Sequence, residues 1–318
     1  MVRVAVIDDY QAVASSMADW SQLSPGAQVE FFHDHLVTRD AIVERLAPFD
    51  VICAMRERTA FPREVLAALP NLRLLVTSGQ RNAAIDVRAA TEYGVVVCGT
   101  GGEAHGTPEL TWALVLAAAR RVPQEDGWLR QGRWQHSVGM HLHGRTLGIV
   151  GLGRLGGIVA GYGQAFGMEV IAWSQNLTDE QAAGVGVARV DKEELFRRSD
   201  VVSVHVVLSE RSTGLVGERE LELMKPTALL VNTSRGPVVD ESALVRALQT
   251  GQIAGAGLDV YSQEPLPSDN PILTAPNTVL TPHLGYVTDA TLQRFYGDMV
   301  EDIRAWLSGS PIRVIASG

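Results

Sequence analysis

Residues 146–156 read Thr-Leu-Gly-Ile-Val-Gly-Leu-Gly-Arg-Leu-Gly, an apolar run that leads directly into the pattern GxGxxG. A second apolar run at Glu169–Trp173 follows after an interval long enough for one helix, which is the strand–helix–strand setting that the pattern requires. Glycines in such a turn let the backbone approach a pyrophosphate, and the helix N-terminus offers it unpaired N–H groups. The stretch therefore predicts a dinucleotide site. The residues expected to form it are Gly151, Gly153, Arg154, Leu155 and Gly156.

The composition indicates a soluble globular protein with two domains. Its 318 residues exceed what one hydrophobic core usually holds, and 46% of them are hydrophobic while 20% are charged. No apolar run reaches membrane-spanning length, and the chain opens with the strand-like run 2–7 instead of a signal peptide. We therefore expect a cytoplasmic location and no membrane partner. The net charge of −9 argues against nucleic acid as a partner.

Metal binding is not expected. The two cysteines, Cys53 and Cys98, lack the CxxC spacing of metal and redox sites, so we expect reduced thiols inside the fold. Two His-x-His pairs have no third ligand nearby in the sequence, and exposed loops explain them better.

Short apolar runs alternate with amphipathic segments along most of the chain, which predicts parallel α/β structure. In the first hundred residues, strands are expected at 2–7, 29–32, 50–54, 72–77 and 95–98. The alternation starts again at Thr146–Val150, and further strands are expected at 169–173, 201–205, 228–232, 256–259 and 278–280. The expected fold class is α/β with two Rossmann-like parallel-sheet domains.

Two helical segments are notable for their apolar residues. The segment 108–119 has almost no polar face, which predicts burial between domains or between subunits. The segment 292–306 carries apolar side chains three and four residues apart. We expect this last helix to pack back on the first domain.

Three polar side chains follow the ends of predicted strands, where open α/β sheets place their ligands. Arg235 follows the strand that ends at Asn232, and a planar guanidinium suits a carboxylate held by two hydrogen bonds. Glu264 lies in a proline-rich loop, and His283 follows another strand. Taken singly, they read equally well as a surface ion pair, a solvated loop residue and a structural histidine.

Four motifs occur in a definite order: GLGRLG at 151–156, NTSRGPVVD at 232–240, LDVYSQEPLP at 258–267 and TPHLG at 281–285. Together they resemble the D-isomer-specific 2-hydroxyacid dehydrogenases, which include phosphoglycerate dehydrogenases and glyoxylate and hydroxypyruvate reductases. The resemblance covers nearly the whole chain. It implies catalytic roles for Arg235, Glu264 and His283.

The resemblance also implies a layout. A discontinuous, flavodoxin-like substrate domain of residues 1–100 and 285–318 would receive an inserted NAD(P)-binding Rossmann domain of residues 101–284, with the active site in the cleft. Family members usually dimerise through the helical region after the first domain, so a homodimer is expected.

The reaction implied is hydride transfer between NAD(P)(H) and a small D-2-hydroxy acid or 2-oxo acid. Arg235 is expected to bind the substrate carboxylate and polarise the carbonyl group, and His283 to donate the proton. Glu264 beside His283 is expected to favour the imidazolium and to orient the ring.

Further substrate contacts are expected from a loop that offers backbone N–H groups to the carboxylate in this family. The matching segment is Gly79-Gln80-Arg81-Asn82, in which Arg81 replaces a glycine and adds a cation. Arg56 resembles a position that faces substrate in phosphoglycerate dehydrogenases, and Tyr286 is expected to line the pocket. The substrate residues expected are Arg56, Gln80, Arg81, Arg235 and Tyr286.

Cofactor choice depends on the end of the second Rossmann strand. There Ser174, followed by Gln175, replaces the acidic residue that would bind the adenosine ribose and repel a 2′-phosphate, although no arginine follows directly. We expect NAD or NADP, with NADP tolerated or preferred. Asp259 resembles the position that holds the nicotinamide carboxamide. The other expected cofactor contacts are His205, Val206, Thr233 and His283.

Two alternatives to a glyoxylate or hydroxypyruvate reductase stay open. Arg56 and Arg81 suit a second anion, which favours D-3-phosphoglycerate dehydrogenase as the enzymatic alternative. Relatives of this fold also act as dinucleotide-sensing corepressors, which bind partners instead of turning over a substrate.

Overall fold

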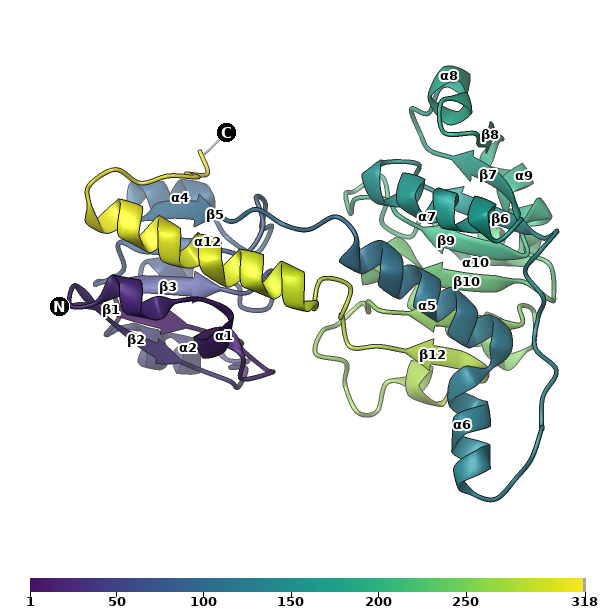
Figure 1. Ribbon diagram of the computed structural model, residues 1–318, viewed down its shortest axis with the longest axis horizontal. Helices are drawn as coiled ribbons and strands as arrows, with labels where there is room; N and C mark the ends of the chain where they lie inside the picture. The colour runs from purple at the N-terminus through teal and green to yellow at the C-terminus, as the bar shows by residue number, and fades with distance from the viewer. Residues whose placement is uncertain (317–318) are drawn as a thin grey trace. The chain divides into compact units, whose positions relative to one another are not determined.

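The computed structural model describes residues 1–316 and divides into two compact units (Figure 1). The first unit combines Met1–Glu103 with the segment from Val287 onward, and the second comprises Ala104–Tyr286. The units thus divide after residues 103 and 286, where the sequence predicts boundaries after 100 and 284. Each unit is a parallel sheet with helices on both faces, which is the predicted α/β class.

The first unit contains a five-stranded parallel sheet in the order β2-β1-β3-β4-β5. Its strands are nearly continuous apolar runs because helices cover both faces. Their bounds are Val2–Val6, Ala27–Phe31, Val51–Ala54, Leu74–Thr77 and Val96–Gly99 for β1 to β5. The ends of all five strands lie within two residues of the predicted runs. In the sheet β2 lies on one side of β1 and β3 on the other, so the chain changes direction across the sheet between β1 and β3.

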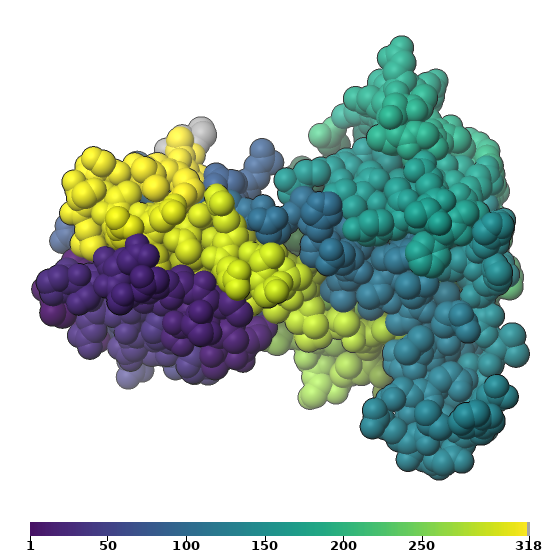
Figure 2. All heavy atoms as spheres, viewed as in Figure 1, coloured from purple at the N-terminus to yellow at the C-terminus, as the bar shows by residue number. Residues whose placement is uncertain are grey.

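Helices α2, α3 and α4 cover one face of this sheet, and α12 with α1 and the 3-10 turn η1 covers the other. The bounds of α2, α3 and α4 are Arg39–Leu46, Arg63–Leu66 and Val87–Glu92, and those of α12, α1 and η1 are Asp289–Leu307, Ala14–Met17 and Trp20–Leu23. Figure 2 shows the side chains of α12 beside those of the N-terminal segment. The final helix therefore packs on the first unit, as its apolar spacing predicts, with Phe295, Tyr296 and Ile303 buried.

The second unit contains a seven-stranded parallel sheet in the order β12-β11-β10-β9-β6-β7-β8. The bounds of β6 to β12 are Thr146–Val150, Glu169–Trp173, Ala188–Arg189, Val201–Val204, Leu229–Asn232, Gly255–Leu258 and Thr278–Leu280. Six of these strands match predicted runs. Strand β8 has no counterpart among the predicted runs, because two exposed residues at a sheet edge carry no apolar periodicity.

Two separate cores cover the faces of this sheet. Helices α5 and α7 pack on one face, while α9, α10 and α11 lie on the other. The bounds of α5 and α7 are Gly106–Arg120 and Arg154–Ala165, and those of α9, α10 and α11 are Lys192–Arg198, Glu218–Leu223 and Glu241–Gln249. Successive strand residues alternate between the two cores, so that Val201 faces α5 and α7 and Val202 faces the opposite layer. The remaining elements of this unit are α6 at Val122–Arg130, α8 at Asp179–Ala183, η2 at Gly236–Val238 and η3 at Pro271–Thr274.

The apolar helix predicted at 108–119 has a different explanation from the expected one. As α5 it buries Trp112, Leu114 and Val115 against its own sheet and against α7. Contacts inside the second unit therefore largely explain why α5 has almost no polar face.

Both cysteines are free thiols inside the first unit. Burial raises the pKa of Cys98 to about 12 and shifts that of Cys53 upward as well, so both stay protonated at neutral pH. Among residues 1–316, no group of three His, Cys, Asp or Glu side chains is arranged to hold a metal ion. None of the helices in this range is both long and apolar enough to cross a membrane.

Candidate active site

The glycine motif forms the expected turn between β6 and α7. Gly151 adopts a left-handed φ of 101°, and a Cβ there would lie 2.8 Å from the carbonyl carbon of His205. A Cβ on Gly156 would lie 2.2 Å from the carbonyl oxygen of Gly151, so only glycine lets α7 approach the strand end this closely. No side chain caps the N-terminus of α7, which leaves its first N–H groups available for an anion.

A cavity of about 460 Å³ opens beside this turn. The loops after β6, β7 and β9 line it, all at the carboxyl ends of the strands. The predicted cofactor residues that line it are Gly151, Gly153, Ser174, Gln175, His205 and Val206. The Ser174 hydroxyl accepts a hydrogen bond of 2.8 Å from the backbone N–H of Leu152, which ties the end of β7 to the glycine turn. These features fit a bound dinucleotide.

His205 contributes a neutral ring to this cavity. Burial lowers the pKa of His205 to about 4, and its Nε2 lies 2.8 Å from the Ser203 hydroxyl. The ring therefore adds no positive charge at neutral pH.

Glu264 and His283 form a close pair at the carboxyl end of the same sheet. The Glu264 Oε2 atom lies 2.6 Å from His283 Nδ1, and the side chains are 34% and 25% exposed. An ionised carboxylate only accepts hydrogen bonds, so Nδ1 carries the proton in this pair. The other ring nitrogen, Nε2, is then left for proton exchange with a ligand. His283 also has a left-handed φ of 53°, a conformation that residues other than glycine rarely adopt and that is concentrated at functional sites.

The buried carboxylate of Asp259 holds the turn that carries His283. It accepts hydrogen bonds from the Thr281 hydroxyl at 2.6 Å, the Leu284 N–H at 2.7 Å and the Gly285 N–H at 2.9 Å. The backbone N–H of His283 donates to the Asp259 carbonyl oxygen at 2.8 Å. Asp259 is wholly buried, and this burial raises the pKa of its carboxyl group. Its positioning of His283 was not foreseen from the sequence, and its contact with the cofactor stays a prediction.

Arg235 lies in the loop after β10, which packs directly on the loop of Glu264. Asn232 shapes this loop, because its side chain accepts from the Ser234 N–H at 3.0 Å and donates to the Arg235 carbonyl at 3.1 Å. A Cβ on Gly236 would lie 1.9 Å from the Tyr261 carbonyl oxygen. The Tyr261 N–H in turn donates to Glu264 Oε1 at 2.9 Å. Backbone contact thus connects the loops of all three predicted catalytic residues.

Two further predicted residues lie near these loops. The rings of Tyr286 and His283 are 5.7 Å apart in an edge-to-face arrangement. Thr233 is buried, and its hydroxyl oxygen lies 2.7 Å from that of Thr111 on α5. Arg154 and Leu155 lie in the first turn of α7.

The other predicted substrate residues lie in the first unit, at the carboxyl ends of β3 and β4. Arg56 adopts a left-handed φ of 52°, and its guanidinium lies so close to Gly79 that a Cβ there would be 2.3 Å from Nη1. The Asn82 side chain donates to the Arg56 carbonyl oxygen at 2.6 Å and to the Thr77 hydroxyl at 2.8 Å. Arg81 is exposed. These contacts join Arg56 to the loop 79–82.

Several further residues line the cavity beside the glycine turn without being among the predicted cofactor contacts. They come mainly from the ends of β7 and β9 and the segments that follow: Trp173, Asn176, Leu177, Gln181, Val207, Ser209, Arg211, Ser212 and Leu215. The most consequential is Arg211, a cation in the same cavity as Ser174. It follows a different strand, so a search for an arginine directly after Ser174 could not find it.

Fold and site together define a dinucleotide-binding oxidoreductase. A family model described as the D-isomer specific 2-hydroxyacid dehydrogenase, NAD binding domain, matches residues 112–285. A glyoxylate reductase of Korarchaeum cryptofilum is 39% identical over 86% of this chain and 84% of its own length. A D-3-phosphoglycerate dehydrogenase of Archaeoglobus fulgidus is 37% identical over 87% of this chain, which spans only 53% of that relative.

A solved structure of a phosphoglycerate oxidoreductase from Vibrio cholerae O395 superimposes with a TM-score of 0.93 at 36% identity, covering 98% of this chain and all of the other. The chain belongs to the D-isomer-specific 2-hydroxyacid dehydrogenase family. This confirms the resemblance predicted from the four motifs. It also confirms an enzyme class in which hydride passes between a nicotinamide dinucleotide and a 2-hydroxy acid or 2-oxo acid.

Adjacent glycines in α7 provide a test of the glycine turn. We expect Gly156→Ala to weaken NADH binding by about tenfold or more, because the added methyl group must displace the Gly151 carbonyl. Gly157→Ala is the matched control, since a Cβ there meets nothing within 4 Å. It should leave binding unchanged and raise stability by about 0.5–1 kcal/mol. Fluorescence titration with NADH and thermal melts measure both effects, and equal affinities in the two variants would contradict the packing argument.

Proposed function

We propose that this chain is an NAD(P)-dependent reductase of a small 2-oxo acid of the glyoxylate or hydroxypyruvate type. The observation that carries the proposal is the Glu264–His283 pair at 2.6 Å, connected by backbone contacts to the loop of Arg235. The pair supplies a proton donor oriented by a carboxylate, and the arginine supplies a cation for a carboxylate substrate. The similarity to a glyoxylate reductase over most of both chains supports the substrate class.

In the proposed reduction, Arg235 binds the substrate carboxylate and stabilises the negative charge that grows on the carbonyl oxygen. His283 gives its Nε2 proton to that oxygen, and Glu264 stabilises the charged ring beforehand and keeps its orientation. A nicotinamide dinucleotide, when bound, would supply the hydride that reduces the carbonyl carbon. The product is a 2-hydroxy acid, and a neutral His283 remains bonded to Glu264. In the direction of oxidation, His283 takes the hydroxyl proton.

We further propose that the first unit is the substrate domain and the second unit the cofactor domain. The glycine turn and the cavity support the second assignment. For the first unit, support comes from Arg56, Gly79 and Arg81 at the carboxyl ends of parallel strands, where α/β sheets bind ligands. The backbone N–H groups of Gln80 and Arg81 are proposed to bind the substrate carboxylate, with Arg56 beside them. The two cations favour D-3-phosphoglycerate dehydrogenase as the second candidate function, because they suit a phosphate group. The cytoplasmic location also stays a prediction.

A panel of 2-oxo acids tests the reaction. With NADPH and NADH, we expect the highest rates for glyoxylate and hydroxypyruvate, whereas a preference for 3-phosphohydroxypyruvate would establish the second candidate. His283→Ala should lower kcat by about 10²–10⁴-fold because the proton donor is lost, and Glu264→Gln by a smaller factor. His141→Ala, an exposed histidine elsewhere, should have no effect. Cofactor binding without turnover of any acid would contradict the proposal and favour a dinucleotide sensor.

We also propose that the site accepts NADPH in preference to NADH. Ser174 presents no negative charge to a 2′-phosphate, and the exposed Arg211 lines the same cavity with a guanidinium that can bind one. We expect Arg211→Ala to raise KM for NADPH by about tenfold and leave KM for NADH unchanged, because NADH lacks this phosphate. Ser174→Asp should reverse the preference. Arg219→Ala, on the surface of α10, is the control. An equal effect of Arg211→Ala on both cofactors would exclude the assignment.

A homodimer is proposed from exposed apolar side chains in α6 and in the segment that follows it. Val122, Leu129, Trp134 and Val138 are 54%, 55%, 75% and 94% exposed, although each is apolar. We expect the protein to sediment as a dimer and the double variant Trp134→Glu/Val138→Asp to sediment as a monomer, since buried charges oppose association. Val37→Asp, at an equally exposed valine in the first unit, should remain dimeric. A monomeric wild-type protein would refute this part of the proposal.

A further inference from the structure

The C-terminal tail is built into the first unit through the edge strand β5. The Gly99 N–H donates to the Arg313 carbonyl at 3.0 Å, and the Ile315 N–H donates to the Val97 carbonyl at 2.8 Å. An antiparallel bridge pairs Cys98 with Val314 between these bonds. The tail therefore joins the sheet directly beside the last residues of β5.

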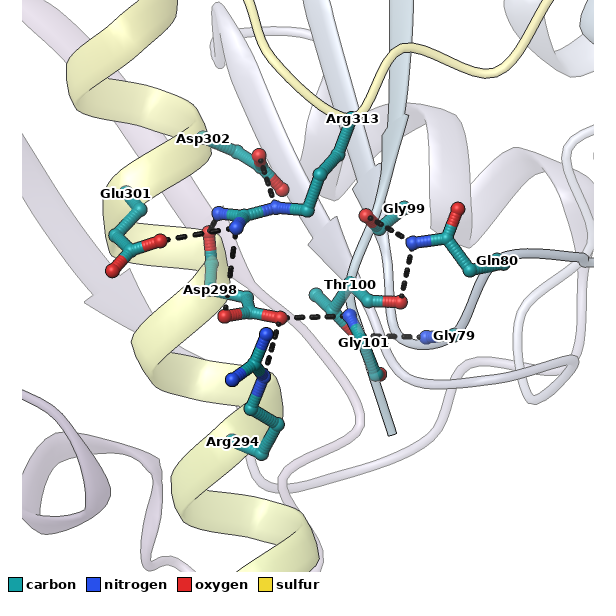
Figure 3. A network of polar contacts seen from close by, with 10 residues as sticks. All are labelled: Gly79, Gln80, Gly99, Thr100, Gly101, Arg294, Asp298, Glu301, Asp302 and Arg313. Atoms are coloured by element: carbon teal, nitrogen blue, oxygen red, sulfur yellow. Dashed lines mark hydrogen bonds and ion pairs between the residues drawn. The ribbon is translucent and has the colours of Figure 1, made fainter. Parts of the chain in front are cut away.

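Arg313 connects this tail to α12. Its Nε donates to Asp302 at 2.9 Å, Nη1 to Glu301 at 3.0 Å and Nη2 to the backbone carbonyl of Asp298 at 2.8 Å (Figure 3). The Asp298 carboxylate also lies 3.6 Å from Nη1. Three acids on one face of α12 thus surround the guanidinium of Arg313, whose side chain is only 21% exposed.

Three carboxylates so close together are stabilised by a neighbouring cation. Arg313 supplies that cation, and its contacts with all three hold its side chain in place. Asp298 and Asp302 are four residues apart on one helix, so their charges repel. Asp302 is wholly buried, and this burial raises the pKa of Asp302 to about 7 although Arg313 opposes the shift. Arg313 has a left-handed φ of 51°, a costly conformation for a residue with a side chain. The surrounding contacts must offset that cost.

Asp298 transmits this arrangement to the segment after β5. Its Oδ2 accepts from the Gly101 N–H at 2.7 Å and from Arg294 Nε at 3.0 Å. The Asp298 side chain is 6% exposed, whereas that of Arg294 is 53% exposed. A carboxylate acceptor makes both bonds stronger than bonds between neutral groups. Gly99 and Gly101 lie on either side of Thr100. The Gly99 N–H therefore bonds to the backbone carbonyl of Arg313, and the Gly101 N–H bonds to the carboxylate of Asp298, which Arg313 contacts.

Thr100 and its neighbours in turn hold the loop proposed to bind substrate. The Gly79 N–H donates to the Thr100 hydroxyl oxygen at 2.8 Å. The Gln80 side chain donates to the Gly99 carbonyl at 3.2 Å and to the Thr100 carbonyl at 2.9 Å (Figure 3). A Cβ on Gly99 would lie 2.6 Å from the Gly79 carbonyl and 3.0 Å from Ile315 Cδ1. The loop, the end of β5 and the tail are in close contact at this point.

We infer that Arg313 is a positioning residue for substrate binding: through Asp298 and the backbone of Gly99–Gly101 it sets the geometry of the loop 79–81. The inference deepens the proposed function and rests on it for the identity of the loop's ligand. Arg313 itself touches no reacting group in this assignment. Its effect reaches the substrate through the contacts of Gly99 and Thr100 with Gly79 and Gln80.

The kinetic test uses Arg313→Ala in the full-length enzyme. Because loop geometry should affect substrate binding and not proton transfer, we expect KM for the 2-oxo acid to rise about tenfold with kcat within about twofold and the NADPH affinity unchanged. Thr100→Val removes the acceptor for the Gly79 N–H at nearly constant volume and should give the same pattern. This second variant keeps the test decisive if Arg313→Ala fails to fold.

Arg304→Ala is the matched control, because Arg304 lies on the same helix but donates to Gln22, outside the network. It should leave KM unchanged. Arg313→Lys, which keeps the charge but loses the forked geometry, should recover only part of the wild-type KM. A normal KM in both Arg313→Ala and Thr100→Val would overturn the inference, as would an equal fall in kcat and in cofactor affinity.

Hydrogen exchange separates failure of this inference from failure of the proposed function. In the unliganded protein, Arg313→Ala should speed amide exchange in peptides covering residues 78–82 at least severalfold relative to Arg304→Ala, whatever acid the enzyme uses. Unchanged exchange there would overturn the positioning role by itself. Faster exchange in a protein that reduces none of the acids would support the positioning of the loop and refute the proposed function alone.

Discussion

The parallel pairing of β10, β11 and β12 determines which loops meet at the carboxyl edge of the second unit's sheet. Parallel strands end at the same edge of a sheet, so the loops that carry Arg235, Glu264 and His283 emerge together although they are distant in the sequence. Without that common edge, the three side chains would be a surface cation, a loop carboxylate and an isolated histidine. The buried carboxylate of Asp259 completes the arrangement because it orders the turn around His283.

Close packing of backbone on backbone is the second recurring feature of the site. Gly156 against Gly151, and Gly236 against Tyr261, leave no room for a Cβ. In the first case the contact brings a helix N-terminus to the edge of the cofactor cavity. In the second it connects the loop of the arginine to the loop of the glutamate. Both contacts require a residue without a side chain, so glycine sets how closely the segments approach at these two places.

The first unit uses a different means to organise its loops. Arg56, Gly79 and Thr100 lie at the ends of three neighbouring strands, and side chain to backbone hydrogen bonds connect them. The charged network of α12 and the tail supports the same region from the far side of β5 (Figure 3). Buried charges of this kind contribute little net stability, because desolvation offsets most of their attraction. Their proposed role is to select one geometry for the ends of these loops.

The sequence by itself determined the class of fold and nearly all strands, and it singled out the residues that we propose as catalytic. These features rest on local patterns: apolar periodicity, the GxGxxG turn after a strand, and four motifs in order. The two-residue strand β8 had no such pattern, and the apolar character of α5 was compatible with several partners. Only the tertiary structure showed that α5 packs on its own sheet. It alone placed Arg211 in the cavity with Ser174, Asp259 beneath the turn of His283, and Arg313 next to Asp298. These contacts join residues that are distant in the chain, and their existence depends on strand order and loop paths, which no short window of sequence contains.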